Sequence, residues 1–283
     1  MKRILLFVLF ALVIFTLGFI QDGGSYISFQ VFIKPGNLYT QTTRNTSYSV
    51  VTFNGSQKYL DELKAKGIPN PTIKADSSLH TTLMATGKMN TGKHFQVIIT
   101  TDNPYIGGTG KTSQDKITVY GQCFLGNLPI LDSVSASAYL DSNIRSKLMQ
   151  SLETSLSRLN LPQQRLRLKQ SFTNTEPLKI PFGNNIMEVI LTTTYRLTKI
   201  SDGVAYFSTS EVYGAKMEAH TSNTPAMLGK GRGKFEYDIK KNYYVTYQTA
   251  DTLYMHLKYN ENLNLDIKSI NGYKMGTTIV AQQ

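Results

Sequence analysis

Residues 186–212 read IMEVILTTTYRLTKI, SDG and VAYFSTSEV in succession, and this stretch decides the fold. The segments 186–200 and 204–212 are rich in Thr, Val, Ile and Tyr, which are the residue types that suit a pleated sheet. The SDG triplet at 201–203 favours a tight turn, because Asp-Gly accepts the positive φ angles that hairpin turns need. The stretch therefore predicts a long β-hairpin.

The same period of two continues through the C-terminal hundred residues. We expect further strands at 231–239, 243–249, 253–259, 263–270 and 274–280, separated by short links at 240–241, 250–251, 260–262 and 271–272. These links are too short for crossover helices, so the pattern predicts an antiparallel meander and excludes a parallel Rossmann-type sheet or barrel in this half.

The N-terminal half mixes strands with two helices. We expect strands at 26–33, 38–53, 78–88, 94–101 and 117–124. A short helix at 57–66 is predicted from Ser56 as N-cap and Gly67 as stop. A longer amphipathic helix is expected to start at Asp141 or Ser142 and to end near Asn160, with one apolar stripe that should pack on the sheet. That stripe consists of Ile144, Leu148, Leu152, Leu156 and Leu159.

These patterns predict a mainly β fold with minor α content. Its antiparallel meander sheets should be curved or partly closed, with one amphipathic helix and one short helix. Because Pro162 ends the long helix, we place a boundary there between an N-terminal half at 25–162 and a C-terminal half at 163–283. Residues 164–172 alternate apolar and basic side chains after this boundary and predict another strand.

An uncharged apolar run at residues 4–20 follows Lys2 and Arg3, which indicates an export signal. Its length falls between a secretory core and a membrane-spanning helix, so cleavage after Gly18 is favoured and an uncleaved N-terminal anchor is the alternative. No cysteine comes directly after the run, which argues against a bacterial lipoprotein. We therefore expect an exported protein, periplasmic or at the cell surface, whose only membrane contact would be an uncleaved segment 4–20.

The chain is basic, with 30 Lys plus Arg against 19 Asp plus Glu and a net charge of +11. For an exported protein the available polyanions are lipid headgroups and envelope polymers rather than nucleic acid, so no nucleic-acid partner is expected. We predict an anion-facing surface on two alternating segments, and the alternative is that both are simply solvated strand faces. Its residues are Arg165, Arg167, Lys169, Lys230, Arg232 and Lys234.

Glycines alternate with the second basic group in GKGRG at 229–233. This segment lacks the last glycine of a dinucleotide fingerprint and leads into a strand, so we interpret it as a sheet feature that permits a bend or close backbone approach. GGTGKT at 107–112 ends like a phosphate-binding loop, but Tyr105 stands where that loop needs glycine and no helix fits after it. Nucleotide binding is therefore not predicted.

No catalytic, metal or cofactor motif is legible. The histidines His80, His94, His220 and His256 lack metal-ligand spacing, and there is no nucleophile elbow. Cys123 is the single cysteine and sits in a strand pattern that indicates packing rather than nucleophilic chemistry. The sequence thus predicts no catalytic residue, no metal and no cofactor.

Three segments of the chain carry a resemblance to known proteins: FTNTEPLKIPF at 172–182, the hairpin at 186–207 and GKGRGKFEYD at 229–238. Together they resemble an uncharacterised family of exported, β-rich bacterial envelope proteins. The resemblance implies a β-rich fold and placement in the periplasm or at the cell surface. That family has no agreed activity, so it transfers no functional residue.

Three functions fit this fold and location. The preferred hypothesis is a non-catalytic binding or carrier protein that takes a lipid or another apolar or amphiphilic ligand on the concave face of a curved sheet. The alternative is an adhesion or assembly protein whose strands and basic faces contact protein or an anionic envelope polymer. A hydrolase is the third, and it would need histidine and carboxylate side chains gathered in one cleft.

Overall fold

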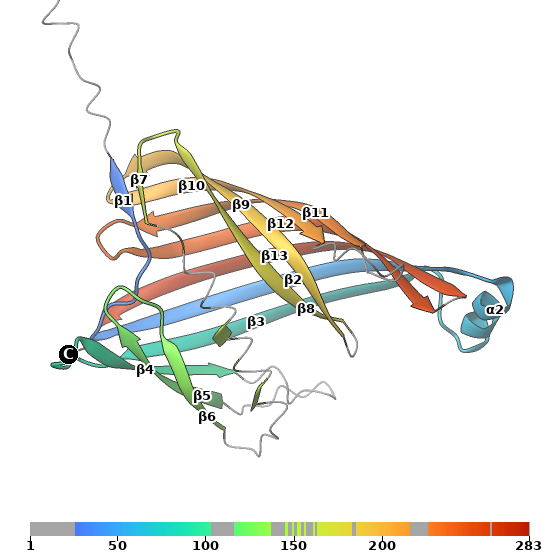
Figure 1. The fold of residues 1–283 in the computed structure, drawn as a ribbon, viewed down its shortest axis with the longest axis horizontal. Helices are drawn as coiled ribbons and strands as arrows, with labels where there is room; N and C mark the ends of the chain where they lie inside the picture. The colour runs from blue at the N-terminus through green and yellow to red at the C-terminus, as the bar shows by residue number, and fades with distance from the viewer. Residues whose placement is uncertain are drawn as a thin grey trace, which may run out of the picture.

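The structure is a computed structural model. It describes residues 26–102, 116–136, 145–146, 149, 152–153, 156, 161, 163–182, 185–215, 226–260 and 262–282. The predicted export segment at 4–20 lies outside the described residues. The described part is mostly long antiparallel strands (Figure 1).

Eleven strands form one antiparallel sheet in the order β6-β5-β4-β3-β2-β13-β12-β11-β10-β9-β8. Their bounds are β2 Asn37–Gly55, β3 Thr72–Thr86, β4 His94–Asp102, β5 Lys116–Phe124, β6 Ile130–Ala136, β8 Ser171–Phe182, β9 Asn185–Ser201, β10 Val204–Ala215, β11 Ala226–Asp238, β12 Tyr243–Asn260 and β13 Leu263–Ala281. All sheet neighbours follow one another in the chain except β2 and β13, whose pairing joins the N-terminal and C-terminal strands. The predicted mainly β fold and the C-terminal meander are confirmed.

The sheet is curved and is not closed by hydrogen bonds. Its edge strands are β6 and β8, and these do not pair with each other in the described residues. Figure 1 shows β8 and β9 crossing obliquely over the direction of β2 and β13, as the accumulated twist of a large sheet requires. We call the face that carries Phe207 and Phe235 the inward face, and the opposite face the outward face.

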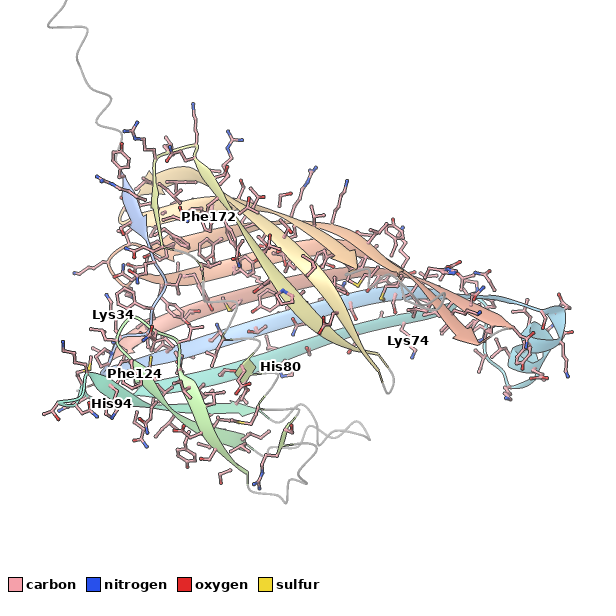
Figure 2. The ribbon with its side chains drawn as sticks, in the orientation of Figure 1. Lys34, Lys74, His80, His94, Phe124 and Phe172 are labelled. Atoms are coloured by element: carbon pink, nitrogen blue, oxygen red, sulfur yellow. The ribbon has the colours of Figure 1, made fainter. Side chains whose placement is uncertain are left out.

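A second, two-stranded sheet pairs β1 (Ile27–Phe29) with β7 (Gln164–Leu166). Phe29 is fully buried, and its ring packs against inward-facing Phe207 and Phe235 with centroid distances of 5.3 and 5.8 Å. The main core therefore lies between β1 and one end of the large sheet. Figure 2 shows Phe172 at this end, whereas Lys74 lies toward the opposite end, which carries α2.

The SDG hairpin is confirmed. Residues Asp202 and Gly203 have φ angles of 54° and 76° and connect β9 to β10. The short helix is also confirmed as α2 (Gln57–Ala65), with Ser56 at the N-cap position but no side-chain cap hydrogen bond. No residue of α2 is buried, so this helix adds little to the core.

Only part of the long helix can be compared with the prediction. Residues 145–146, 149, 152–153 and 156 are helical, and Leu152 and Leu156 pack against the main core as expected. Ile144, Leu148 and Leu159 lie outside the described residues. Within the described part of the chain, no helix has the length and apolar character needed to cross a membrane.

The predicted breaks at 250–251 and 271–272 are wrong, because β12 and β13 run through them. Asp251 and Asn271 are turn-forming types, but here they are direct partners in the β12–β13 ladder. The Asn271 side-chain amide donates a hydrogen bond of 2.8 Å to Asp251 Oδ1. This cross-strand pair satisfies both side chains without a turn.

The predicted strand at 164–172 is wrong in its middle. Strand β7 ends at Leu166, and the chain then turns before β8 begins at Ser171. Lys169 has a φ angle of 70°, and its backbone N–H donates to Leu197 O at 2.8 Å. The turn leaves Leu168 48% exposed. The alternation of apolar and basic residues in this segment therefore does not correspond to a continuous strand. Strand β6 had no counterpart in the prediction.

Candidate ligand-binding cavity

A cavity of about 510 Å³ lies on the inward face of the large sheet. One part of its lining is apolar, with Met84, Ile99, Leu152, Leu156, Leu161 and Leu191. Another part consists of tyrosines, namely Tyr39, Tyr195, Tyr213, Tyr243, Tyr244, Tyr247 and Tyr273. The cavity is thus amphipathic, since phenol hydroxyls bring hydrogen-bonding groups to walls that are otherwise hydrophobic.

A row of polar residues crosses five successive strands on this face. Thr193, Glu211, Gly231, Asp251 and Asn271 are register partners on β9, β10, β11, β12 and β13. We call these five residues the polar row. Gly231 makes the row compact, because a Cβ atom there would lie 2.8 Å from Glu211 Oε2 and 3.1 Å from Asp251 Cβ. The acidic side chains therefore occupy the space that a larger residue on β11 would fill.

A hydrogen-bond network joins the polar row to the tyrosines above and below it. Both oxygens of Glu211 accept phenol hydroxyls, and the network then continues through Asp251 and Asn271 to Ser269. Its bonds are Tyr247 OH to Glu211 Oε1 at 2.9 Å, Tyr213 OH to Glu211 Oε2 at 2.8 Å, Tyr213 OH to Asp251 Oδ2 at 3.4 Å, Asn271 Nδ2 to Asp251 Oδ1 at 2.8 Å and Ser269 Oγ to Asn271 Oδ1 at 2.9 Å. A connected network of this kind fixes the side chains that face the cavity.

The electrostatic character of the cavity is acidic although the chain is basic. Glu176, Glu211 and Asp251 line it, and no Lys or Arg occurs among its described lining residues. Glu211 is only 3% exposed. Burial raises the pKa of Tyr195 well above its usual value, and the negative charges of Glu176 and Glu211 raise that pKa further. The carboxylates of Glu176 and Glu211 thus make ionisation of the Tyr195 phenol in the same cavity less favourable.

Aromatic rings stand next to the polar row. Phe235 meets Tyr247 edge to face at 5.9 Å between centroids, and it meets Tyr195 at 6.0 Å. Tyr247 in turn meets Tyr273 at 5.9 Å. These mutual contacts hold the ring orientations, so the cavity has a fixed aromatic wall rather than a set of independent side chains.

The opposite, outward face is basic. As the alternation at 229–233 predicted, Lys230, Arg232 and Lys234 are exposed there, while the intervening glycines point inward. The register adds exposed Arg196, Lys274 and Arg44, which lie in the same cross-sheet row as Lys234. Lys268 is also exposed on this face. We call these seven residues the outward basic surface.

The other three predicted anion-facing residues lie elsewhere. Arg165 is on β7 in the two-stranded sheet, and Arg167 and Lys169 are in the turn that follows. The guanidinium groups of Arg165 and Arg167 stack on Tyr26 at 4.4 and 4.3 Å from the ring centroid. All three basic side chains are exposed, but no contact among the described residues joins them to the β11 group. The six residues therefore do not share one strand face.

No metal site is formed in the described part of the chain, where no group of three His, Cys, Asp or Glu side chains is arranged to hold an ion. His80 lines the cavity, but no hydrogen bond joins it to a carboxylate among the described residues. His256 pairs with Asp266 at 2.6 Å on an exposed part of the sheet. His220 and residues 107–112 lie outside the described residues.

Cys123 is fully buried, and desolvation raises the pKa of its thiol to about 11. Thiolates are the nucleophilic form of cysteine, and a raised pKa keeps this thiol protonated at neutral pH. The structure agrees with the interpretation that Cys123 is a packing residue.

No protein-family model matches the chain, and no curated protein matches it. Among solved structures, the attachment invasion locus protein Ail of Yersinia pestis is similar over 86% of this chain and 99% of that chain, with 6% identity and a TM-score of 0.15. A TM-score this low gives no basis for transferring a fold or a function. Of what the family resemblance implied, the β-rich fold is confirmed, and the exported envelope location stays a prediction.

Proposed function

We propose that the protein is a non-catalytic binding or carrier protein that holds an amphiphilic small molecule on the inward face. The amphipathic cavity carries this proposal, because its apolar and polar walls suit the two parts of such a molecule. Its volume of about 510 Å³ also falls within the usual range for small-molecule pockets. The leader-like run at 4–20 supports the proposal that this binding takes place in the cell envelope.

The side-chain arrangement favours storage over turnover. Tyr213 and Tyr247 already bind both oxygens of Glu211, which positions that carboxylate for recognition. The single cysteine is buried away from the cavity-lining set. A bound molecule would thus meet fixed polar groups and apolar walls, as in other binding pockets.

The direct experiment is extraction of the purified protein with organic solvent followed by mass spectrometry. We expect a stoichiometric amphiphile that is absent from a parallel preparation of a cavity-filled variant. An extract without such a molecule, from protein that also fails to take up apolar probes, would contradict the proposed function.

Filling the cavity should abolish probe binding. Thr43 lines the cavity, whereas Thr42 is exposed and its side chain points to the other face of β2. We expect Thr43→Trp to weaken binding of the neutral fluorophore N-phenyl-1-naphthylamine at least tenfold, since the indole occupies ligand space. Thr42→Trp is the matched control and should bind as the wild type does. Fluorescence titration measures both, and equal affinities would place the probe elsewhere.

A second candidate function is favoured by the outward basic surface. We propose that this surface contacts an anionic polymer of the envelope. Lys234, Lys274 and Arg44 lie in one cross-sheet row on β11, β13 and β2, and all three are exposed. Such an arrangement raises the local positive potential beyond that of scattered charges. This role is compatible with ligand binding because it uses the opposite face of the sheet.

Removing charge from that row should weaken polyanion binding. We expect Lys234→Gln, Lys274→Gln and Arg44→Gln together to elute from heparin–agarose at clearly lower salt, because three phosphate-like or sulfate contacts are lost. The control is Lys58→Gln, Lys64→Gln and Lys66→Gln on and just after α2, which removes the same charge from another exposed place. If both triple variants elute at equally lowered salt, the weaker binding comes from the lower net charge alone, and the outward basic surface has no specific role.

A further inference from the structure

We propose that the cavity selects amphiphiles with a cationic organic head group and that Glu211 is the residue that recognises this group. This inference rests on the proposed function and specifies its ligand class. The ligand chemistry meant is a primary or quaternary ammonium attached to an apolar chain.

The burial of the Glu211 carboxylate is the central observation. Its side chain is 3% exposed, yet the partners it has among the described residues are the neutral phenols of Tyr213 and Tyr247. Buried carboxylates are ordinarily paired with a cation, because hydrogen bonds alone compensate only part of the lost hydration. No described Lys or Arg lines the cavity to supply that charge. A ligand cation would therefore complete the pairing.

Unsatisfied hydroxyls give a second, independent observation. Thr277 lines the same cavity, is 8% exposed, and its Oγ1 has no hydrogen-bond partner among the described residues. Thr209 lies outside the cavity lining, two residues before Glu211 on the same face of β10; it is 5% exposed, and its Oγ1 also has no partner in the described part of the chain. Buried polar atoms without partners are rare in folded proteins, so the Thr277 hydroxyl, which lines the cavity, indicates a group that a bound molecule satisfies.

The aromatic wall supports a cation rather than a second hydrogen-bond donor. Phe235, Tyr247 and Tyr273 form a chain of edge-to-face ring contacts beside the polar row. Ring faces attract ammonium groups electrostatically, and the attraction is larger where water is excluded. An organic cation fits this wall better than a metal ion, because no three-ligand metal group exists among the described residues.

The test compares three competitors that share a decyl chain and differ only in head group. Decyltrimethylammonium, decyl sulfate and decyl glucoside are each titrated, below their micelle concentrations, against protein loaded with N-phenyl-1-naphthylamine. We expect the ammonium compound to displace the probe at a concentration on the order of tenfold lower than the other two, as one favourable buried contact would give.

A pair of variants assigns the preference. Glu211→Gln keeps the shape and removes the charge, so the preference for the ammonium compound should fall to near one. Glu62→Gln on exposed α2 removes the same charge elsewhere and should leave the preference unchanged. The readout is a ratio between competitors, which a general loss of affinity does not change.

The outcomes separate this inference from the proposed function. Equal displacement by all three compounds in the wild type overturns the cationic preference and leaves amphiphile binding in place. A preference that persists in Glu211→Gln overturns the role of Glu211. Probe that does not bind the wild type at all contradicts the proposed function itself.

Discussion

Raising the pH above 10 should unfold this protein cooperatively. Burial raises the pKa values of Tyr195, Tyr243 and Tyr244 above the ordinary tyrosine value, and desolvation is the largest cause for each. Tyr243 and Tyr244 stack on each other at 4.6 Å between ring centroids and line the cavity next to the core. Ionisation of any of these phenols in the folded state would place a charge in a poorly hydrated site.

The loss of stability at high pH follows from proton linkage. In the unfolded chain a tyrosine ionises near pH 10, whereas these three stay protonated to higher pH when folded. Their contribution is therefore fully present below pH 10 and is lost as the pH rises through the folded-state pKa values. Each phenol lowers the free energy of unfolding by about 1.4 kcal/mol per pH unit in this window, so three lower it by about 4 kcal/mol per unit. A typical stability of about 5–15 kcal/mol would be consumed by about pH 12.

Absorbance at 295 nm measures ionisation of the tyrosines, and circular dichroism measures unfolding of the sheet. Phenolate absorbance from the buried tyrosines should appear in the same transition as the loss of ellipticity. Tyr243→Phe combined with Tyr244→Phe should move the midpoint to higher pH, and Tyr48→Phe, at an exposed position, should leave it unchanged. Titration of all tyrosines near pH 10 with the fold intact would show that these phenols are not buried.

Local alternation predicted most of the strands, but it did not predict which residues meet on each face of the sheet. The hairpin around 201–203 and the meander after it follow from residue types within ten positions of each other. The polar row does not, because Glu211, Asp251 and Asn271 become neighbours only through the registers of β10 to β13. A one-residue slip in any register would move one of these side chains to the outward face.

The same reasoning explains the breaks that were predicted wrongly. Asp251 and Asn271 were interpreted as turn residues because their side chains commonly bond to their own backbone. In the sheet they bond to each other, and the information for this lies in the pairing partner rather than in the local sequence. Polar residues inside an alternating run were thus the most informative signal for the cavity. Periodicity alone led to their interpretation as turn residues between strands.

The outward basic surface shows what part of a site can be predicted. Lys230, Arg232 and Lys234 alternate within one strand, so the sequence alone placed them on one face. Arg44 and Arg196 lie far away in the chain and join Lys234 only through cross-sheet pairing. No signal in a single sequence marks that row. Glu176, Glu211 and Asp251 line the cavity on the inward face, so the sheet places acidic and basic groups on opposite sides of these strands, a property of the register rather than of composition.

Phe29→Ala should be the most destabilising single truncation in the described core. The Phe29 ring is fully buried and contacts four other rings, with centroid distances between 4.9 and 5.8 Å. Removing it leaves a cavity that four aromatic neighbours on three strands cannot fill by small shifts, since they are anchored by the large sheet. We expect a loss of about 3–5 kcal/mol in the free energy of unfolding, the usual range for a buried phenylalanine.

Strand β1 has only three residues, and Phe29 attaches the two-stranded sheet to the main core together with Ile27 and Leu166, which are buried in the same cluster. Urea denaturation should therefore show a lower midpoint for Phe29→Ala, and proteolysis should cut near β1 before the rest of the chain unfolds. Phe124→Ala is the matched control, because that ring is 43% exposed on β5 and should cost less than about 1 kcal/mol. Equal midpoints for the two variants would mean that β1 is not docked on the inward face, and the core would then have to be closed by other residues.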